Sequence, residues 1–223
     1  MKHAAHVVAG SEHLAQVART ITDRVSVFPT VVPCTTWTPR VNLRGAGVPV
    51  IGWIGTFGTA RYLNLVLPAL RRLRAEGRQF RVRIVGAGPD FDPQLEHERV
   101  TWSLEREVEN FRELDIGLAP VADDEWGRGK CAFKQVQYFA TGVACVTSPI
   151  GPAKGFAELG AALGARNQQE WYSALTRLLD DAQLRRQLAK TARELVEHRL
   201  CTEIQGPNLA ALFGEVIEQK RSR

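Results

Sequence analysis

Residues 115–142 have the sequence DIGLAPVADDEWGRGKCAFKQVQYFATG, in which a short apolar run leads through an acidic, glycine-containing loop into an amphipathic segment. The apolar run at 115–119 predicts a buried β-strand. The pattern over 130–141 predicts a helix with one apolar face and one polar face. A strand, a loop and a crossover helix in this order are typical of one unit of a parallel sheet.

The same alternation of strand and helix patterns continues on both sides of this stretch. Strands are predicted over residues 49–54, 80–85, 99–102, 115–119 and 143–147. Helices are predicted between them over residues 61–75, 105–114 and 130–141, and after them over residues 168–180, 181–198 and 208–219. Because successive βα units are right-handed, this order predicts an α/β fold with a doubly wound parallel sheet.

The first 48 residues fit this series poorly. A strand over residues 6–9, a helix over 12–19 with Ser11 as its N-cap, and a strand over 24–28 lead into a linker rich in Pro and Thr. Two strands and one helix are too few to bury a core of their own. We therefore predict three parts, which are residues 1–48, 49–198 and 199–223.

The composition is that of an ordinary globular chain. Its 223 residues are 44% hydrophobic and 24% charged, which excludes a disordered or collagen-like protein. The 29 basic and 24 acidic residues give a net charge of +5 but are interleaved, so we expect a mixed solvated surface and no nucleic-acid partner. The longest uncharged run, residues 135–153, is interrupted by Gly and Pro and predicts no membrane-spanning helix.

The cysteines and histidines show no metal-binding or catalytic spacing. Cys34, Cys131, Cys145 and Cys201 are scattered, with no C-x-x-C motif and no histidine at zinc-ligand spacing. We therefore expect reduced thiols, no metal site and a cytoplasmic protein, and the polar start at residues 1–3 predicts no secretory signal peptide. No Ser-His-Asp or Cys-His arrangement can be read from the sequence, which argues against a hydrolytic triad.

Ligands of an open parallel sheet bind at the carboxyl ends of its strands, so the loops after the strands are candidate sites. The loop at 55–59 has two glycines and two threonines before Arg61, and a phosphate cradle and a tight turn that needs Gly explain it equally well. The G-x-G at 86–88 lacks the third glycine of a dinucleotide site. Trp102 either meets a nucleobase or belongs to the core. The loop at 148–152 closes the same edge.

Two lysines on the helix predicted over 130–141 are the strongest candidates for chemistry. We expect Phe133 on the packed apolar face of this helix. The opposite, outward face has Lys130, Lys134, Gln137 and Tyr138. Only six lysines occur in the chain, and a positive charge near the positive end of the helix dipole costs up to about 1 kcal/mol. A bound diphosphate would reverse this effect, and the alternative is two ordinary surface lysines.

The chain resembles the donor-binding domain of glycosyltransferase family 4, or glycosyl transferases group 1, in the strings at residues 115–120, 126–130, 133–134, 137–142 and 148–151. The resemblance implies a Rossmann-like, nucleotide-sugar-binding domain of the GT-B fold over residues 49–198. It implies that residues 1–48 are the end of an N-terminally truncated acceptor domain, and that 199–223 form the C-terminal crossover helix. It also implies a retaining, metal-independent enzyme that needs no cofactor.

The resemblance further implies a site. Its catalytic residues are Lys130 and Lys134, and its donor-binding residues are Gly55, Thr56, Phe57, Arg61, Gly86, Trp102, Gly129, Gln137, Ser148 and Gly151. The E-x7-E motif of the family falls on Gly129 and Gln137, so both glutamates are missing. An amide at 137 can still bond ribose hydroxyls, and Lys130 or Glu125 can substitute at the first position. We interpret this departure as the trait of a subfamily with an R-G-K-x-x-F-K string.

The expected function is sugar transfer with retention from a nucleotide diphosphate sugar, in bacterial polysaccharide or glycoconjugate synthesis. The alternative is a fragment or module that binds a sugar nucleotide without transferring the sugar. Expected partners are the nucleotide sugar and an acceptor of unknown kind. Peripheral association with the inner face of a membrane and a separate acceptor-domain chain are both open alternatives.

Overall fold

A six-stranded sheet forms the centre of the computed structural model, which describes residues 3–40 and 47–221. The strands are β3 (Val50–Ile54), β4 (Arg81–Val85), β5 (Glu98–Val100), β6 (Ile116–Ala119), β7 (Ala144–Thr147) and β8 (Leu163–Gly164). Their order is β5-β4-β3-β6-β7-β8, and every pairing is parallel. The chain moves outward from β3 to β5, returns to β6 beside β3 and then moves the other way, which confirms the doubly wound α/β fold.

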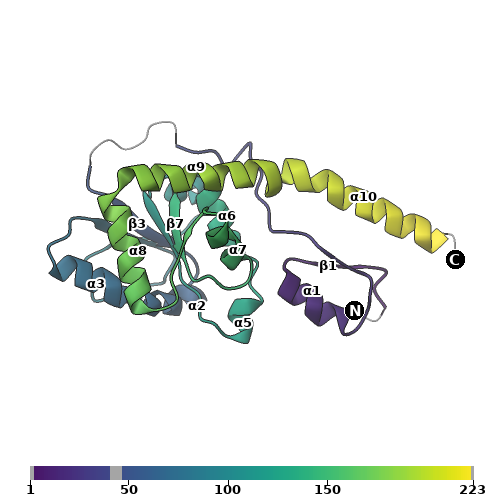
Figure 1. The fold of residues 1–223 in the computed structure, drawn as a ribbon, viewed down its shortest axis with the longest axis horizontal. Coiled ribbons are helices and arrows are strands. Elements are labelled where there is room, and N and C mark those ends of the chain that lie inside the picture. The colour runs from purple at the N-terminus through teal and green to yellow at the C-terminus, as the bar shows by residue number, and fades with distance from the viewer. Residues whose placement is uncertain (1–2, 41–46, 222–223) are drawn as a thin grey trace.

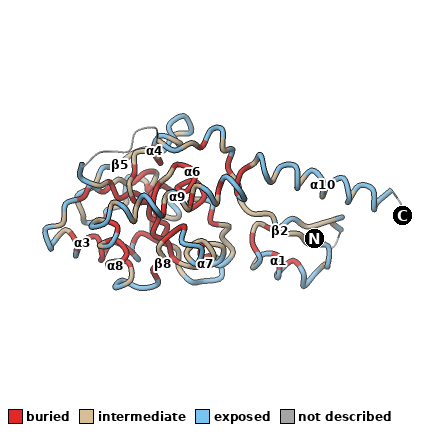
Figure 2. Tube along the Cα trace, turned by 45° about the horizontal axis from the view of Figure 1, so that its top comes forward, coloured by how far each residue is buried: buried red, intermediate tan, exposed pale blue. Residues whose placement is uncertain are grey.

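Helices cover both faces of this sheet (Figure 1). They are α2 (Phe57–Ala60), the 3-10 helix η1 (Arg61–Leu65), α3 (Leu67–Ala75), α4 (Glu107–Arg112), α5 (Glu125–Arg128), α6 (Phe133–Ala140), α7 (Pro152–Glu158), α8 (Gln168–Asp180) and α9 (Ala182–Arg199). In β3, Ile51 and Trp53 belong to the core shared with α3 and α8, whereas Val50 and Ile54 belong to the core shared with α4, α6 and α9. Buried residues are therefore concentrated along the strands, as Figure 2 shows.

Three predicted helices have different limits in the structure. The helix over 61–75 is divided into η1 and α3, and Pro68 lies in the first turn of α3, where proline is tolerated. The helix over 130–141 begins only at Phe133, because Ala132 before it adopts the left-handed conformation with φ of 56°. The last helix, α10 (Thr202–Arg221), begins before its predicted start and contains Pro207. Strand β8 was not predicted, because two residues give no readable alternation.

Residues 7–27 form a small separate unit, which we call the N-terminal unit. Strands β1 (Val7–Ala9) and β2 (Val25–Val27) pair in parallel, and α1 (Glu12–Arg19) connects them. The Ser11 side chain accepts the backbone N–H of Leu14 at 3.3 Å, so the predicted N-cap is confirmed. The unit and α10 both extend from the same end of the main domain (Figure 1).

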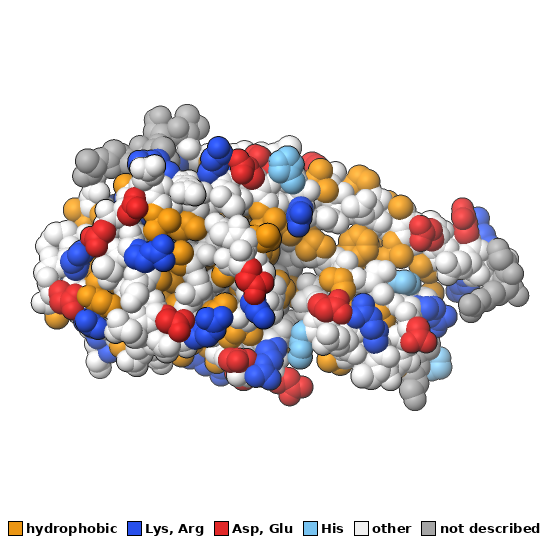
Figure 3. All heavy atoms as spheres, in the orientation of Figure 1, with side chains coloured by type: hydrophobic (Ala, Val, Ile, Leu, Met, Phe, Trp, Pro, Cys, Tyr) orange, Lys and Arg blue, Asp and Glu red, His pale blue; other side chains and the backbone are white. Residues whose placement is uncertain are grey.

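Acidic and basic side chains alternate over the face shown in Figure 3, and hydrophobic side chains lie along α10. Three large apolar side chains of that helix are exposed, namely Ile204, Phe213 and Ile217. Within the described ranges, no helix combines the length and apolar character that crossing a bilayer requires.

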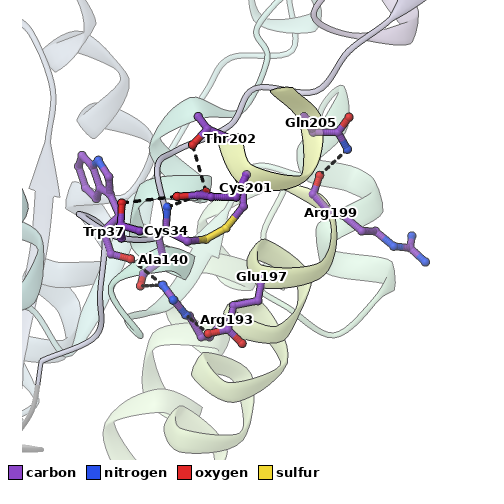
Figure 4. Close-up of a disulfide and its surroundings, with 11 residues drawn as sticks. Cys34, Trp37, Ala140, Arg193, Glu197, Arg199, Cys201, Thr202 and Gln205 are labelled. Carbon is purple, nitrogen blue, oxygen red and sulfur yellow. Dashed lines mark hydrogen bonds and ion pairs between the residues drawn. A yellow bond between two sulfur atoms is a disulfide. The ribbon is translucent and has the colours of Figure 1, made fainter. Parts of the chain in front are cut away.

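A disulfide joins the linker after the N-terminal unit to the start of α10 (Figure 4). Cys34 and Cys201 have Cα atoms 5.6 Å apart, beside a parallel bridge between Val32 and Cys201. Glu203 accepts the backbone N–H of Cys34 at 3.2 Å. The prediction of reduced thiols is wrong for this pair, because 167 residues separate the two cysteines and only the fold brings them together. Cys131 and Cys145 are free thiols.

Candidate functional site

A cleft of about 510 Å³ lies at the carboxyl ends of the central strands. Backbone and side chains from the loops after the strands form its walls, with Gly55 and Thr56 after β3, Pro120 after β6, Ser148 after β7 and Trp102 after β5. The β3–β6 boundary is the point where the strand order reverses, and ligands of doubly wound sheets bind at this point. Three segments singled out from the sequence, namely the 55–59 loop, Trp102 and the 148–152 loop, therefore line one cleft, whereas residues 86–88 are not among its lining residues.

Lys134, which is half-buried, places its amino group in this cleft. It lies in the first turn of α6, and its Nζ is 4.3 Å from the centroid of the Trp53 ring. A Cβ atom built on Gly55 would lie only 2.7 Å from this Nζ, so glycine leaves the room that the amino group occupies. Burial, assisted by the charge of Lys130, lowers the pKa of Lys134 to about 7. An anion in the cleft would restore the protonated form.

Lys130 reaches the same cleft from a different element than predicted. It lies in the loop between α5 and α6, where its backbone N–H donates to the carbonyl of Gly127 at 3.1 Å. Its Nζ is 5.8 Å from the Tyr62 ring centroid and 5.6 Å from that of Trp126. The prediction that Lys130 lies in the first turn of a helix is wrong, because the left-handed Ala132 separates it from α6.

The predicted faces of α6 are also partly wrong. Phe133, expected to pack, is 48% exposed, whereas Tyr138, expected outside, is fully buried. The Tyr138 hydroxyl donates to the carbonyl of Leu118 at 3.1 Å and accepts the N–H of Ile54 at 3.3 Å. Its ring lies where a side chain on Gly117 would be, and burial raises its pKa well above the ordinary value. Tyr138 thus ties β3 to β6 under the cleft.

The two glycine loops support each other. Gly86 has a φ of +77°, which favours glycine, and a Cβ atom on it would lie 2.2 Å from the carbonyl oxygen of Gly55. The Gly55 N–H donates to the carbonyl of Val85 at 3.0 Å. Gly86 therefore stands behind the cleft wall and holds Gly55 in place. The close packing of the two loops thus supports the explanation that Gly55 is needed for steric reasons. No contact among the described residues tests whether the 55–59 loop also binds a phosphate.

The remaining predicted residues divide into two groups. Trp102, Gln137 and Ser148 line the cleft together with the two lysines. Four others lie outside the lining, and these are Phe57, Arg61, Gly129 and Gly151. Phe57 is 71% exposed, and the Arg61 guanidinium lies over the Tyr62 ring at 5.2 Å. Gly151 (φ +55°) packs behind the Lys130 loop, since a Cβ atom there would lie 3.4 Å from the Lys130 carbonyl oxygen.

Among the lining residues that sequence reasoning missed are Trp53, Tyr62 and Glu107. Trp53 falls in the strand predicted over 49–54 and Tyr62 in the helix predicted over 61–75, and neither pattern marks a residue of a site. Trp53 and Lys134 are about 80 residues apart in the chain, so no local pattern indicates that the Trp53 ring lies against the amino group of Lys134. Glu107 comes from α4, and its Oε1 accepts a hydrogen bond of 3.2 Å from Nε2 of Gln137. Nothing in the local sequence marks Glu107, because the pairing of α4 with α6 is set by the fold.

The chain thus combines a doubly wound parallel sheet with a cleft at its switch point, the place where sheets of this kind bind ligands. The family model named Glycosyl transferases group 1 matches residues 48–181, and the chain belongs to this family. No curated protein sequence matches the chain.

Solved glycosyltransferases share the fold at low sequence identity. A glycosyltransferase from Rickettsia africae ESF-5 superimposes with a TM-score of 0.77 and 16% identity over 95% of this chain and 63% of that one. Anabaena Alr3699/HepE in complex with UDP and glucose gives 0.76 and 14% over 95% and 63%. Sucrose-phosphate synthase from Thermosynechococcus elongatus gives 0.72 and 16% over 98% and 60%. These matches confirm the GT-B glycosyltransferase fold, and the chain spans less than two thirds of each structure.

Proposed function

We propose that the cleft binds a nucleoside diphosphate sugar and supplies the donor site for sugar transfer. The observation that supports this proposal is the pair of lysines in the cleft. Among the residues described, neither lysine takes part in an ion pair, and the ion pairs of the neighbouring loop use Arg128 and Asp123 instead. A diphosphate would supply the missing negative charge. The related Anabaena structure in complex with UDP-glucose is consistent with such a ligand.

The two lysines would act on the leaving group. In the proposed reaction the bond between the anomeric carbon and the diphosphate oxygen breaks, and an acceptor oxygen bonds to the same carbon. The acceptor proton passes to the departing diphosphate. Lys130 and Lys134 stabilise the negative charge that grows on this group, so the reaction needs neither a side-chain nucleophile nor a metal ion.

Other parts of the proposal rest on the family resemblance. On this resemblance we propose that the sugar is transferred with retention and that the protein takes part in bacterial polysaccharide or glycoconjugate synthesis. We also propose that it acts in the cytoplasm or at the inner face of the membrane. We also propose that residues 1–48 and 199–223 are parts of an acceptor half, and that residues 49–198 are the donor half.

A second candidate is a module that binds the sugar nucleotide without transferring the sugar. The residues at the two E-x7-E positions favour it, because neither Gly129 nor Gln137 supplies a carboxylate to the donor. Measuring UDP release from UDP-glucose in the presence of candidate acceptors separates the two. Binding without release supports the module, and acceptor-dependent release supports the transferase.

The lysine pair gives the direct test of the donor site. We expect Lys130→Ala and Lys134→Ala each to weaken the binding of UDP or GDP at least tenfold, since each removes a charge-assisted contact worth roughly 1.5–3 kcal/mol. Titration calorimetry measures the affinity. Lys154→Ala is the matched control, because Lys154 lies on α7, is exposed and pairs with Glu158 at 3.9 Å. Affinities that are unchanged in the two cleft variants would overturn the proposal.

A further inference from the structure

Glu107 places a carboxylate in a cleft whose other charged lining residues are Lys130 and Lys134. It is the first residue of α4 and is half-buried. Nε2 of Gln137 donates to its Oε1 at 3.2 Å, and Gln137 is only 5% exposed. A buried amide on α6 therefore holds this carboxylate in a fixed orientation.

The basic residues near Glu107 are engaged with other acids. Arg106 pairs with Glu113 at 3.4 Å, and Arg112 pairs with Glu109 at 3.6 Å. In the part of the chain that the structure describes, no ion pair includes Glu107. Its carboxylate oxygens have four lone-pair positions in all, and Gln137 fills one of them. Acceptor capacity is thus left over at the cleft.

A carboxylate is an unexpected lining group for a site that holds a diphosphate. An ionised carboxylate only accepts hydrogen bonds, and it repels phosphate oxygens more strongly the closer they lie. The ligand group beside Glu107 must therefore carry no negative charge and must donate hydrogen bonds. In a nucleoside diphosphate sugar, such donors are the ribose hydroxyls, the hydroxyls of the transferred sugar and the N–H groups of the base.

The positions of the cleft residues favour the ribose. Lys134 and Gln137 are three residues apart on α6, so their Cβ atoms lie roughly 5–6 Å apart on neighbouring turns. The ribose follows the first phosphate after one methylene group, and the base lies farther away. Trp102, 43% exposed, lines the cleft in the segment before α4 and offers an indole surface on which a base can stack.

The opposite side of the cleft remains for the transferred sugar. The sheet order places the loops after β6 and β7 on one side of the switch point and the segment after β5 on the other. Lys130, Ser148 and Ile150 belong to the first side, and Glu107 and Trp102 belong to the second. A diphosphate between the two lysines therefore has its nucleoside toward Glu107.

We propose that Glu107, oriented by Gln137, recognises the ribose by accepting hydrogen bonds from its 2′- and 3′-hydroxyls. This inference rests on the proposed function, because it requires a ribonucleoside diphosphate in the cleft. According to this proposal, Glu107 on α4 selects ribonucleotides over deoxyribonucleotides. The nucleoside of the donor then lies toward Glu107, and the transferred sugar lies on the opposite side of the cleft.

Calorimetry with UDP, 2′-deoxy-UDP, 3′-deoxy-UDP and inorganic pyrophosphate tests the assignment in the full chain. The wild-type protein should bind UDP at least tenfold more tightly than either deoxy analogue. Glu107→Gln should lower UDP affinity at least tenfold and remove the preference for UDP over its analogues, while pyrophosphate affinity should not fall. Glu109→Gln is the matched control, since Glu109 lies on the same helix outside the cleft lining, and it should behave as wild type.

Each other result has a definite meaning. Equal affinities of the wild-type protein for UDP and both deoxy analogues overturn the inference, as does a preference that persists in Glu107→Gln. A loss in Glu107→Gln that affects UDP-glucose but not UDP would assign Glu107 to the transferred sugar, and a loss confined to GDP would assign it to the base. Both results also overturn the inference. If neither UDP, GDP nor pyrophosphate binds the wild-type protein, the proposed function itself fails.

Discussion

Lys134 lies in an environment that disfavours the charged form of its amino group in the ligand-free protein. Its amino group lies against the Trp53 ring and above Gly55, with a pKa of about 7 in place of its ordinary value of 10.5. Keeping a positive charge in this position costs free energy in the ligand-free protein, because the group loses water without gaining an anion. Functional sites are common places for such groups.

This cost predicts a pH-dependent stability difference between the wild-type protein and Lys134→Met. Between pH 7 and 10.5 the unfolded state binds more protons at Lys134 than the folded state, so the stability of the wild-type protein rises with pH over this interval. Below pH 7 the lysine is charged in both states and the destabilisation is complete. Lys134→Met should therefore raise the melting temperature at pH 6 by several degrees, since about 1 kcal/mol corresponds to roughly 2–4 °C in a chain of this size.

Differential scanning calorimetry at pH 6 and pH 9.5 checks this prediction. The difference between Lys134→Met and the wild-type protein should shrink at the higher pH, while Lys154→Met, at an exposed position, should show no comparable difference. A lower melting temperature of Lys134→Met at pH 6 would contradict the explanation.

At the scale of elements, the sequence predicted the repeating order but not the limits that shape the cleft. Strands β3 to β7 and the helices between them follow from alternating apolar patterns, because both periodicities are local. The start of α6 does not, since the left-handed Ala132 has no signature that distinguishes it from a helical alanine. Both lysines nevertheless line one cleft, because both follow β6 at the carboxyl edge of the sheet.

Long-range pairings between elements account for what the sequence could not predict. Trp53 reaches Lys134 through the adjacency of β3 and β6, and Glu107 reaches Gln137 through the packing of α4 near α6. No spacing rule connects residues that are this far apart in the chain. The E-x7-E pattern illustrates the point, because the carboxylate that lies next to Gln137, with Oε1 of Glu107 3.2 Å from Nε2 of Gln137, comes from another helix.

At the scale of the whole molecule, the N-terminal unit and the main domain meet beside the cleft. A Cβ atom on Gly10 would lie 2.5 Å from Sγ of Cys131, and one on Gly129 would lie 3.6 Å from the Leu14 side chain. The loop that holds Lys130 is therefore packed between the two parts. The linker and the start of α10, tied by Cys34 and Cys201, form the second connection between them.

The disulfide should contribute measurably to stability. It closes a loop with a sequence separation of 167 residues, and constraints on unfolded chains of this length stabilise proteins by roughly 2–5 kcal/mol. We expect dithiothreitol to lower the urea midpoint of the wild-type protein and to leave that of the Cys34→Ser, Cys201→Ser double variant unchanged. Thiol labelling under denaturing conditions without reductant should modify only Cys131 and Cys145. Labelling of all four cysteines would show that the pair is reduced.

The central claim is that Lys134 binds the diphosphate in its protonated form. At pH 8 this lysine is mostly neutral in the ligand-free protein, because its pKa is about 7. UDP is fully ionised at the same pH, because the pKa of its terminal phosphate is about 6. Binding should therefore take up close to one proton, which calorimetry in buffers of different ionisation enthalpy measures directly. We predict this uptake for the wild-type protein and its loss in Lys134→Met. Binding of UDP without proton uptake, or equal uptake by the variant, would contradict the account.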